Sequence, residues 1–456
     1  MILRDVEVEG HGGLDVRLED GRIAEIGHRL AARGEELDGA GGALIPGLAD
    51  HHIHLFALAA QAASIDVAAA ANPAGFAELV TRAACARPAG AWLRITGYHE
   101  RIAGELTRER LDQLAPAHRL RVQHQTGALW VLNSLALASV CGDDAPDFVE
   151  GGSGRIWRQD AWLRTRIREE PPPLGVVGRE LAAHGVTAVT DASVTTDADA
   201  AARLAAAVRA GELPQRLTLM SGGALEKADD GAYAVGPVKV LLDDHALPDL
   251  DDFISRIRAA RLWNRPVAVH CVTAAELALT LAAFDAAGAR RGDRIEHGGL
   301  IPAGAIEQLK ALGLAVITQS AFIHERGDRY VADVPEAEQQ DLYRCGSLQD
   351  SGVAVAGSSD APYASPDPWA GMRAATTRQT LGGLVLGARE RISPEAALAL
   401  YLGRPSDPGG AARRLAVGEP ADLCLLRVPL RAALAELRCE LVRATLLRGE
   451  LGHLVA

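Results

Sequence analysis

The chain has 456 residues, 48% of them hydrophobic, which is enough to bury a large core in one α/β barrel or in several smaller domains. It contains 47 Lys and Arg residues against 59 Asp and Glu, giving a net charge of −12. No basic block of the kind that binds phosphate backbones is present, so nucleic acid is not expected as a partner.

The six cysteines include no C-x-x-C pair, which argues against a disulfide framework and against a cysteine-ligated zinc ribbon. The chain begins without a charged-then-apolar signal pattern, and none of its apolar runs approaches the roughly 18 residues that a membrane helix requires. We therefore expect a cytoplasmic protein with no membrane partner.

The first 45 residues alternate apolar and polar positions in short runs separated by glycine-rich turns, which predicts small antiparallel strands. From residue 43 to about residue 406, short Val, Ile and Leu runs alternate with Ala- and Leu-rich helical stretches, the pattern of βα units around a parallel sheet. The candidate strands of that sheet are 44–48, 93–96, 119–123, 187–190, 238–242, 267–270, 294–296, 315–318 and 353–356.

Short β-like runs return at 421–426 and 442–448, after the last helical stretch. A barrel whose two chain ends pair into one small β domain explains this symmetry. We therefore predict a (β/α)8 TIM-type barrel over residues 46–411 and a small β-sandwich domain built from residues 1–45 and 412–456.

His52 and His54 are two residues apart at the end of an apolar run, so on a strand their side chains point to the same face. Two neutral imidazoles on one face make half of a tetrahedral zinc site. Taken alone, the pair is more often two polar residues at the end of a strand.

Three further polar residues follow predicted strands. His270 and His297 end the fifth and sixth strands of the predicted barrel, and Asp360 follows the eighth. Barrel enzymes place their catalytic groups at these carboxyl ends, whereas a core histidine more often lies within a strand or on the apolar face of a helix. Together with His52 and His54, these residues predict one metal site.

This set of residues resembles that of the amidohydrolase superfamily, and within it the branch of N-substituted formamide deformylases, amidohydrolase family 3. The resemblance covers essentially the whole chain. The segments that carry it are Pro46-Gly47-Leu48-Ala49-Asp50-His51-His52-Ile53-His54, Gly185-Val186-Thr187-Ala188-Val189-Thr190-Asp191, Arg294-Ile295-Glu296-His297, Gly357-Ser358-Ser359-Asp360-Ala361-Pro362 and Gly418-Glu419-Pro420-Ala421-Asp422-Leu423.

The resemblance implies one or two divalent metal ions, with zinc expected, held by His52, His54, His270, His297 and Asp360. Lys239 lies where two-metal members carry a carboxylated lysine, whose carbamate oxygens can bridge two cations. Two alternatives stay open: an ammonium paired with Asp243 or Asp244, and a substrate contact beside a single metal.

The chain departs from the family pattern in two loops. Many relatives carry Gly-Trp-Asp where this chain has Gly97-Tyr98-His99, and a histidine where it has Ala128. We therefore expect a rearranged substrate site and do not transfer formamide specificity. The candidate substrate contacts are Tyr98, His99, Gln319 and His324, although a solvated loop position is the more common role for a histidine placed like His324.

The implied activity is hydrolysis of a C–N bond in a small-molecule amide, cyclic amide or amidine. A divalent metal lowers the pKa of bound water from about 15.7 to near 7, and Asp360 acts as ligand and proton shuttle. The alternatives are a deaminase, lactonase or decarboxylase that uses the same metal site, and a catalytically silent binding protein. The resemblance also leaves a homodimer open.

Overall fold

The computed structural model describes residues 1–455 except 69, 127, 143–145, 151 and 168–171. The neighbour of Ala128 in the departing loop, Gly127, thus lies outside the described residues. The chain divides into two compact units, one formed by Met1–Leu55 and Leu174–Ala456 and the other by Phe56–Pro173. The second unit falls inside residues 46–411, which are expected from the sequence to form the barrel without a separate unit.

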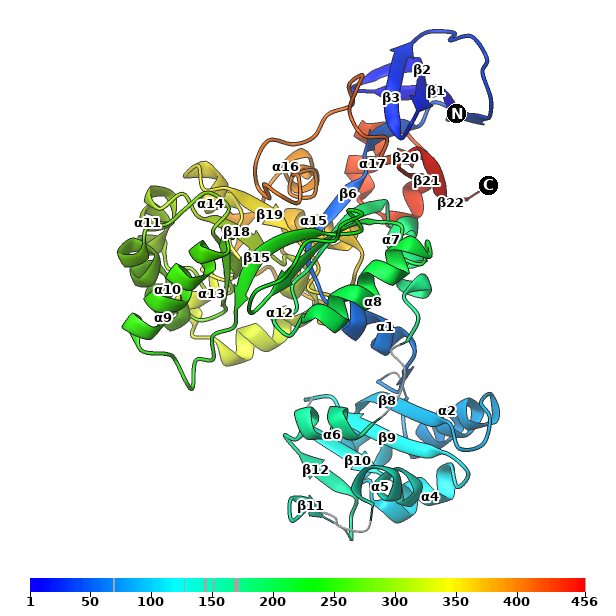
Figure 1. Cartoon of the computed structure of the whole chain (residues 1–456), viewed down its shortest axis with the longest axis vertical. Helices are drawn as coiled ribbons and strands as arrows, with labels where there is room; N and C mark the ends of the chain where they lie inside the picture. Colours follow the sequence, from blue (N-terminus) through cyan, green and yellow to red (C-terminus); the bar gives the residue numbers. More distant parts are fainter. Residues whose placement is uncertain (69, 127, 143–145, 151, 168–171, 456) are drawn as a thin grey trace. The chain divides into compact units, whose positions relative to one another are not determined.

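Eight parallel strands form the barrel sheet of the first unit (Figure 1). In spatial order they are β6 (Leu48–Ile53), β13 (Val186–Asp191), β14 (Arg216–Ser221), β15 (Ala234–Val240), β16 (Val267–Cys271), β17 (Arg294–His297), β18 (Ala315–Thr318) and β19 (Val355–Gly357). The segment after β19 hydrogen-bonds to the end of β6: Asp360 N donates to His52 O at 2.8 Å and His54 N donates to Ala361 O at 2.9 Å. These bonds join the first strand to the last, and the predicted barrel is confirmed.

The helices of this unit include long ones that follow the barrel strands along the chain. Thr273 and Glu276 form a capping box that starts the longest of them, α10 (Ala274–Ala287), directly after β16. The remaining helices are α7 (Gly175–Ala183), α8 (Ala198–Arg209), α9 (Leu250–Leu262), α11 (Ile306–Ala311), α12 (Ala321–Asp333), α13 (Glu336–Gln339), α14 (Gly346–Asp350), α15 (Pro368–Thr377), α16 (Pro394–Ala399) and α17 (Leu430–Glu436).

Strands from the two chain ends share a second sheet, seen in blue and red in Figure 1. Strand β20 pairs antiparallel with β5, which joins the two ends. The sheet contains β1 (Ile2–Val8), β2 (His11–Glu19), β3 (Arg22–Gly27), β4 (Glu36–Asp38), β5 (Ala43–Pro46), β20 (Leu423–Leu426), β21 (Val442–Leu447) and β22 (Glu450–Leu454).

The inserted unit has a sheet and a core of its own. Its strands are, in spatial order, β11 (Val149–Glu150), β12 (Arg155–Trp157), β10 (Leu129–Leu132), β9 (Arg119–His124), β8 (Trp92–Tyr98) and β7 (Ile65–Asp66). Its helices are α2 (Pro73–Cys85), α3 (Glu100–Ala103), α4 (Arg108–Leu114), α5 (Ser134–Cys141) and α6 (Asp160–Arg166); α1 (Leu55–Ala62) begins at the boundary between the units.

Two candidate barrel strands, 93–96 and 119–123, belong to β8 and β9 of the inserted unit, so their assignment to the barrel is wrong. The candidate 44–48 coincides mainly with β5 of the sheet from the chain ends and overlaps barrel strand β6 only at Leu48. The third barrel strand, β14, is absent from the candidates. Barrel strands such as β13 and β17 are buried along their whole length, whereas buried and half-buried positions alternate in β8 and β9. A short apolar run alone does not show to which sheet a strand belongs. The number of expected barrel strands, nine, is close to the observed eight because candidates outside the barrel replace barrel strands that were missed.

Among the described residues, no helix combines the length and the apolar character needed to cross a bilayer.

A buried ion pair between Arg344 and Glu390 joins α14 to the segment before α16. Arg344 Nη1 donates to Glu390 Oε1 at 2.6 Å, and Ser347 donates to the same carboxylate through its hydroxyl at 2.6 Å and its N–H at 3.0 Å. Burial alone would raise the pKa of Glu390, but the bonds from Ser347 and Arg344 lower it below the ordinary 4.5. The pair therefore contributes its full stability above pH 4.5 and loses it as the pH falls through the lower pKa of the folded state.

Glu390→Gln is expected to lower the free energy of unfolding by about 1–3 kcal/mol, because it weakens the charge-assisted hydrogen bonds from Arg344 and Ser347 while Arg344 keeps its ion pair with Asp341. Urea unfolding at pH 7 measures the loss. The control is Glu395→Gln on the exposed face of α16, where a change within about 0.5 kcal/mol is expected. Equal stability of the two variants would contradict the assignment.

Candidate functional site

The structure brings the four predicted histidines together at the carboxyl ends of barrel strands. His52 lies in β6, His54 just beyond it, and His270 and His297 lie in β16 and β17. The ring centroids of His52 and His54 are 5.4 Å apart, those of His52 and His297 4.8 Å, and those of His270 and His297 4.5 Å. Segments more than two hundred residues apart in the chain thus meet in one cluster.

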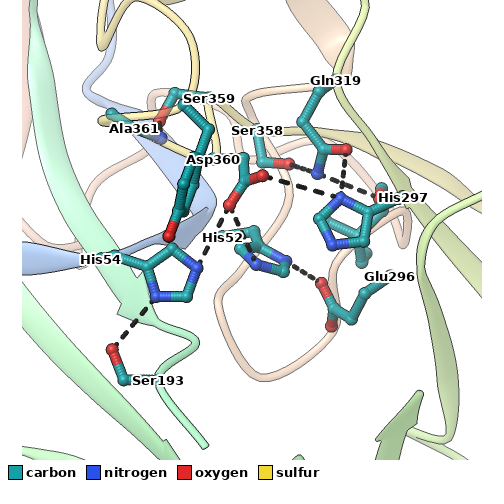
Figure 2. A network of polar contacts seen from close by, with 12 residues as sticks. His52, His54, Ser193, Glu296, His297, Gln319, Ser358, Ser359, Asp360 and Ala361 are labelled. Atoms are coloured by element: carbon teal, nitrogen blue, oxygen red, sulfur yellow. Dashed lines mark hydrogen bonds and ion pairs between the residues drawn. The ribbon is translucent and has the colours of Figure 1, made fainter. Parts of the chain in front are cut away.

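Asp360 follows β19 and points into this cluster (Figure 2). Its Oδ1 lies 3.4 Å from His52 Nε2 and 3.2 Å from His54 Nε2, and its Oδ2 lies 3.9 Å from His297 Nδ1. Burial alone would raise the pKa of Asp360, but the contact with His54 and the nearby imidazoles of His52 and His297 hold it well below its ordinary value. The carboxylate is therefore ionised at neutral pH.

Three of the imidazoles are held from behind through Nδ1. His52 Nδ1 contacts Glu296 Oε2, His54 Nδ1 lies 3.1 Å from Ser193 Oγ, and His297 Nδ1 lies 2.8 Å from Gln319 Oε1. Figure 2 shows Glu296, Ser193 and Gln319 each beside the ring that it contacts. Metal-binding histidines characteristically use their second nitrogen in this way.

Burial favours the neutral form of three of these histidines, His52, His270 and His297. Burial lowers the pKa values of His52 and His297, and it lowers that of His270 to about 4, with the charge of Lys239 adding to the effect in each case. A neutral imidazole is the form that binds a metal ion.

The donor atoms fit a divalent cation. Atoms of His52, His54 and Asp360 that could act as ligands all lie within 4.8 Å of one another. Asp360 Oδ1 is buried and, within the described part of the chain, accepts no hydrogen bond of regular geometry. Two imidazole nitrogens and a carboxylate oxygen are ligands typical of zinc.

Lys239 in β15 is a buried amine beside the same cluster. Its side chain is 4% exposed, and its Nζ has no hydrogen-bond partner among the described residues, so the ammonium pair with Asp243 or Asp244 is absent there. Burial lowers the pKa of Lys239, although the carboxylates of Glu296 and Asp360 partly oppose this effect. An uncompensated buried amine is costly, which points to a partner that the protein groups do not supply.

The backbone at two of these residues is strained. His297 has φ 71° and Asp360 has φ 55°, both in the left-handed region that side-chain-bearing residues rarely adopt. Such conformations cluster at functional sites, where the surrounding structure enforces them.

Two predicted substrate contacts in the first unit are engaged by protein groups. Gln319 is fully buried, with its Oε1 near His297 and its Nε2 donating to Ser358 Oγ at 2.8 Å. His324 lies in α12 with its Nδ1 2.9 Å from the carbonyl oxygen of Gln379. Gln319 therefore supports His297. His324, in α12, contacts the backbone of the segment that follows α15.

The other two, Tyr98 and His99, belong to the inserted unit. Tyr98 is fully buried, and its hydroxyl donates to Gly104 O at 2.8 Å. His99 caps α3 by accepting from Arg101 N at 3.0 Å. His99 also lies near Glu100 and His124 in a second group with metal-ligand chemistry, but its Nδ1 is already used by the helix cap.

Sequence reasoning missed the residues that support the ligands. Glu296 stands directly before His297 in the motif that carries the family resemblance, and its place in the predicted strand 294–296 was the available signal. Asp50 accepts from the backbone N–H of His52 and of Ser359, both at 3.1 Å, and burial raises its pKa to about 6. Ser193 carried no sequence signal, because only the folded barrel places it beside His54.

Comparison with known proteins gives a consistent result. A model of the amidohydrolase family matches residues 35–452. The N-substituted formamide deformylase of Arthrobacter pascens is 24% identical over 529 aligned positions, covering 99% of this chain and 97% of the deformylase.

Two solved structures share the fold. An uncharacterized metal-dependent hydrolase from Pyrococcus horikoshii OT3 matches with a TM-score of 0.77 at 20% identity, covering 93% of this chain and 97% of that chain. Atrazine chlorohydrolase from Arthrobacter aurescens TC1, complexed with zinc, matches with a TM-score of 0.56 at 14% identity, covering 99% of this chain and 94% of that chain.

Proposed function

The chain belongs to the amidohydrolase family, and from that premise we propose that it is a metal-dependent hydrolase that cleaves a C–N bond of a small-molecule amide, cyclic amide or amidine. The observation that carries this proposal is the position of Asp360 Oδ1, which lies between the Nε2 atoms of His52 and His54. The deformylase relative acts on a C–N bond, which supports the reaction class without fixing the substrate.

We assign His52, His54, His270, His297 and Asp360 to the metal, with zinc as the preferred ion. The nitrogen and carboxylate donors and the zinc complex of a protein with the same fold support that choice. When bound, such an ion lowers the pKa of water from about 15.7 to near 7 and polarises a carbonyl group.

Asp360 moves the proton in the proposed reaction. Its ionised carboxylate accepts a proton from the attacking water through one oxygen and returns it to the nitrogen of the leaving amine, so that the amine departs neutral. The imidazoles of His52, His54 and His297 lie around this buried carboxylate.

Lys239 is proposed to carry a carbamate. Its neutral amine would add to carbon dioxide with release of one proton, and the carbamate oxygens would then serve as ligands. The buried Nζ without a partner and its closeness to the histidine cluster support this role over a contact with substrate.

Removal of the metal tests the proposal. Dialysis against a chelator is expected to abolish hydrolysis, and zinc is expected to restore it, in an assay of N-substituted formamides, cyclic amides and amidines that follows amine release. Lactones, decarboxylation substrates and ammonia release are tested in parallel. Full activity after chelation, with zinc absent by elemental analysis, would exclude metal-dependent hydrolysis; activity confined to lactones or to ammonia release would change the reaction class.

A further inference from the structure

A chain of buried charged groups runs behind the metal-site histidines. Glu296 in β17 is fully buried, with its Oε2 against His52 Nδ1 and its Oε1 accepting from Arg294 Nε at 2.6 Å. Arg294 is also buried, and its Nη2 donates to the carbonyl oxygen of His51 at 3.2 Å. The carboxylate is thus fixed at both oxygens, one by Arg294 and one by His52.

The contact with Glu296 decides which nitrogen of His52 carries the proton. An ionised carboxylate can only accept hydrogen bonds, and a neutral imidazole has a single N–H. In its neutral form, His52 therefore keeps the proton on Nδ1 and presents the lone pair of Nε2 to Asp360 Oδ1, 3.4 Å away. Two acceptors that face each other at this distance are placed to share a cation.

The partners of the other two rings impose weaker constraints. The hydroxyl of Ser193 beside His54 Nδ1 can donate or accept, so it permits either tautomer. The amide of Gln319 beside His297 presents its oxygen only because its nitrogen donates to Ser358. Glu296 is therefore the acceptor-only partner among the three and fixes a tautomer by itself.

We propose that Glu296, oriented by Arg294, is a positioning residue that sets the metal affinity of the site by holding His52 in the Nδ1–H tautomer. The inference rests on the proposed role of His52 as a metal ligand and adds to it the group that prepares this ligand before the metal arrives. A glutamine at position 296 could donate its amide N–H to His52 Nδ1, which would move the imidazole proton to Nε2, where it blocks the ligand position.

The test measures zinc binding rather than turnover. For Glu296→Gln, competition with a chromophoric chelator is expected to give a dissociation constant for zinc about 10–100-fold above that of the wild type. Glu296→Asp keeps an acceptor-only group that is one methylene shorter, so a smaller increase than that of Glu296→Gln is expected.

Because Glu296→Gln leaves Arg294 buried without its partner, the double variant Arg294→Met/Glu296→Gln keeps the proposal testable if the single variant does not fold. The double variant removes both charges, and zinc binding weaker than that of the wild type is expected, because an amide that Arg294 no longer orients does not enforce the Nδ1–H tautomer. The matched control is Glu390→Gln, which breaks a buried Arg–Glu pair with no histidine beside it. It is expected to lower the melting temperature while leaving the zinc dissociation constant within threefold of the wild type.

Wild-type zinc affinity in a folded Glu296→Gln or double variant would overturn the proposal, as would equal weakening by Glu390→Gln. Failure of the proposed function is visible separately, because it appears as wild-type protein that binds no zinc or as a zinc affinity unchanged by His52→Ala.

Discussion

Asp360→Asn is expected to lower kcat/KM by about a hundredfold to ten-thousandfold, the contribution typical of a positioned proton-transfer group. The asparagine amide can still offer an oxygen to a cation, but it has no charge and cannot take a proton from water at neutral pH. The assay uses the best substrate from the C–N panel under saturating zinc, with metal content determined on the same sample.

The matched control is Asp367→Asn. Asp367 caps α15 by accepting from Trp369 N at 2.9 Å, a role that asparagine also performs, so wild-type activity is expected. Undiminished turnover of metal-loaded Asp360→Asn would remove Asp360 from proton transfer and leave it, at most, a metal ligand.

Lys239→Ala is expected to lower the metal content and to reduce activity by at least about a hundredfold, because a ligand that bridges two cations would be lost. Added acetate or propionate is expected to restore part of both, since a small carboxylate can occupy the space of the missing carbamate. Lys310→Ala, on the exposed side of α11, is the control and is expected to keep wild-type metal content. Unchanged metal content in Lys239→Ala, with no response to carboxylates, would contradict the carbamate.

The sequence predicted the cluster of His52, His270, His297 and Asp360 because each residue stands at the end of an apolar run. In a parallel barrel all such ends meet at one rim, so position along the chain translates directly into position in space. The barrel itself followed from the alternation of strands and helices, and the structure confirms it.

The inserted unit and the supporting contacts could not be predicted in this way. The runs at β8 and β9 are short and partly apolar, as barrel strands also are, and pairing between strands is a long-range property that a local pattern does not encode. Tyr98 stands near a motif position used by relatives, yet its side chain is buried in the core of the inserted unit. The hydrogen-bond partner of a polar side chain depends on tertiary packing, which a single sequence does not display.

The role of Glu296 also could not be predicted from its position in the sequence. Its place beside His297 suggested an ordinary motif residue, whereas its side chain supports His52, 244 positions earlier in the chain. Successive strand residues ordinarily point to opposite faces, yet Glu296 and His297 both reach His52, because His297 ends β17 with a φ of 71°.

The most direct test of the metal site is a crystal structure with anomalous diffraction recorded above and below the zinc absorption edge. The proposed site predicts a peak bounded by His52 Nε2, His54 Nε2 and Asp360 Oδ1, with metal–ligand distances of about 2.0–2.2 Å. A zinc-loaded, active protein whose peak lies elsewhere, for instance beside His99 and His124, would contradict it.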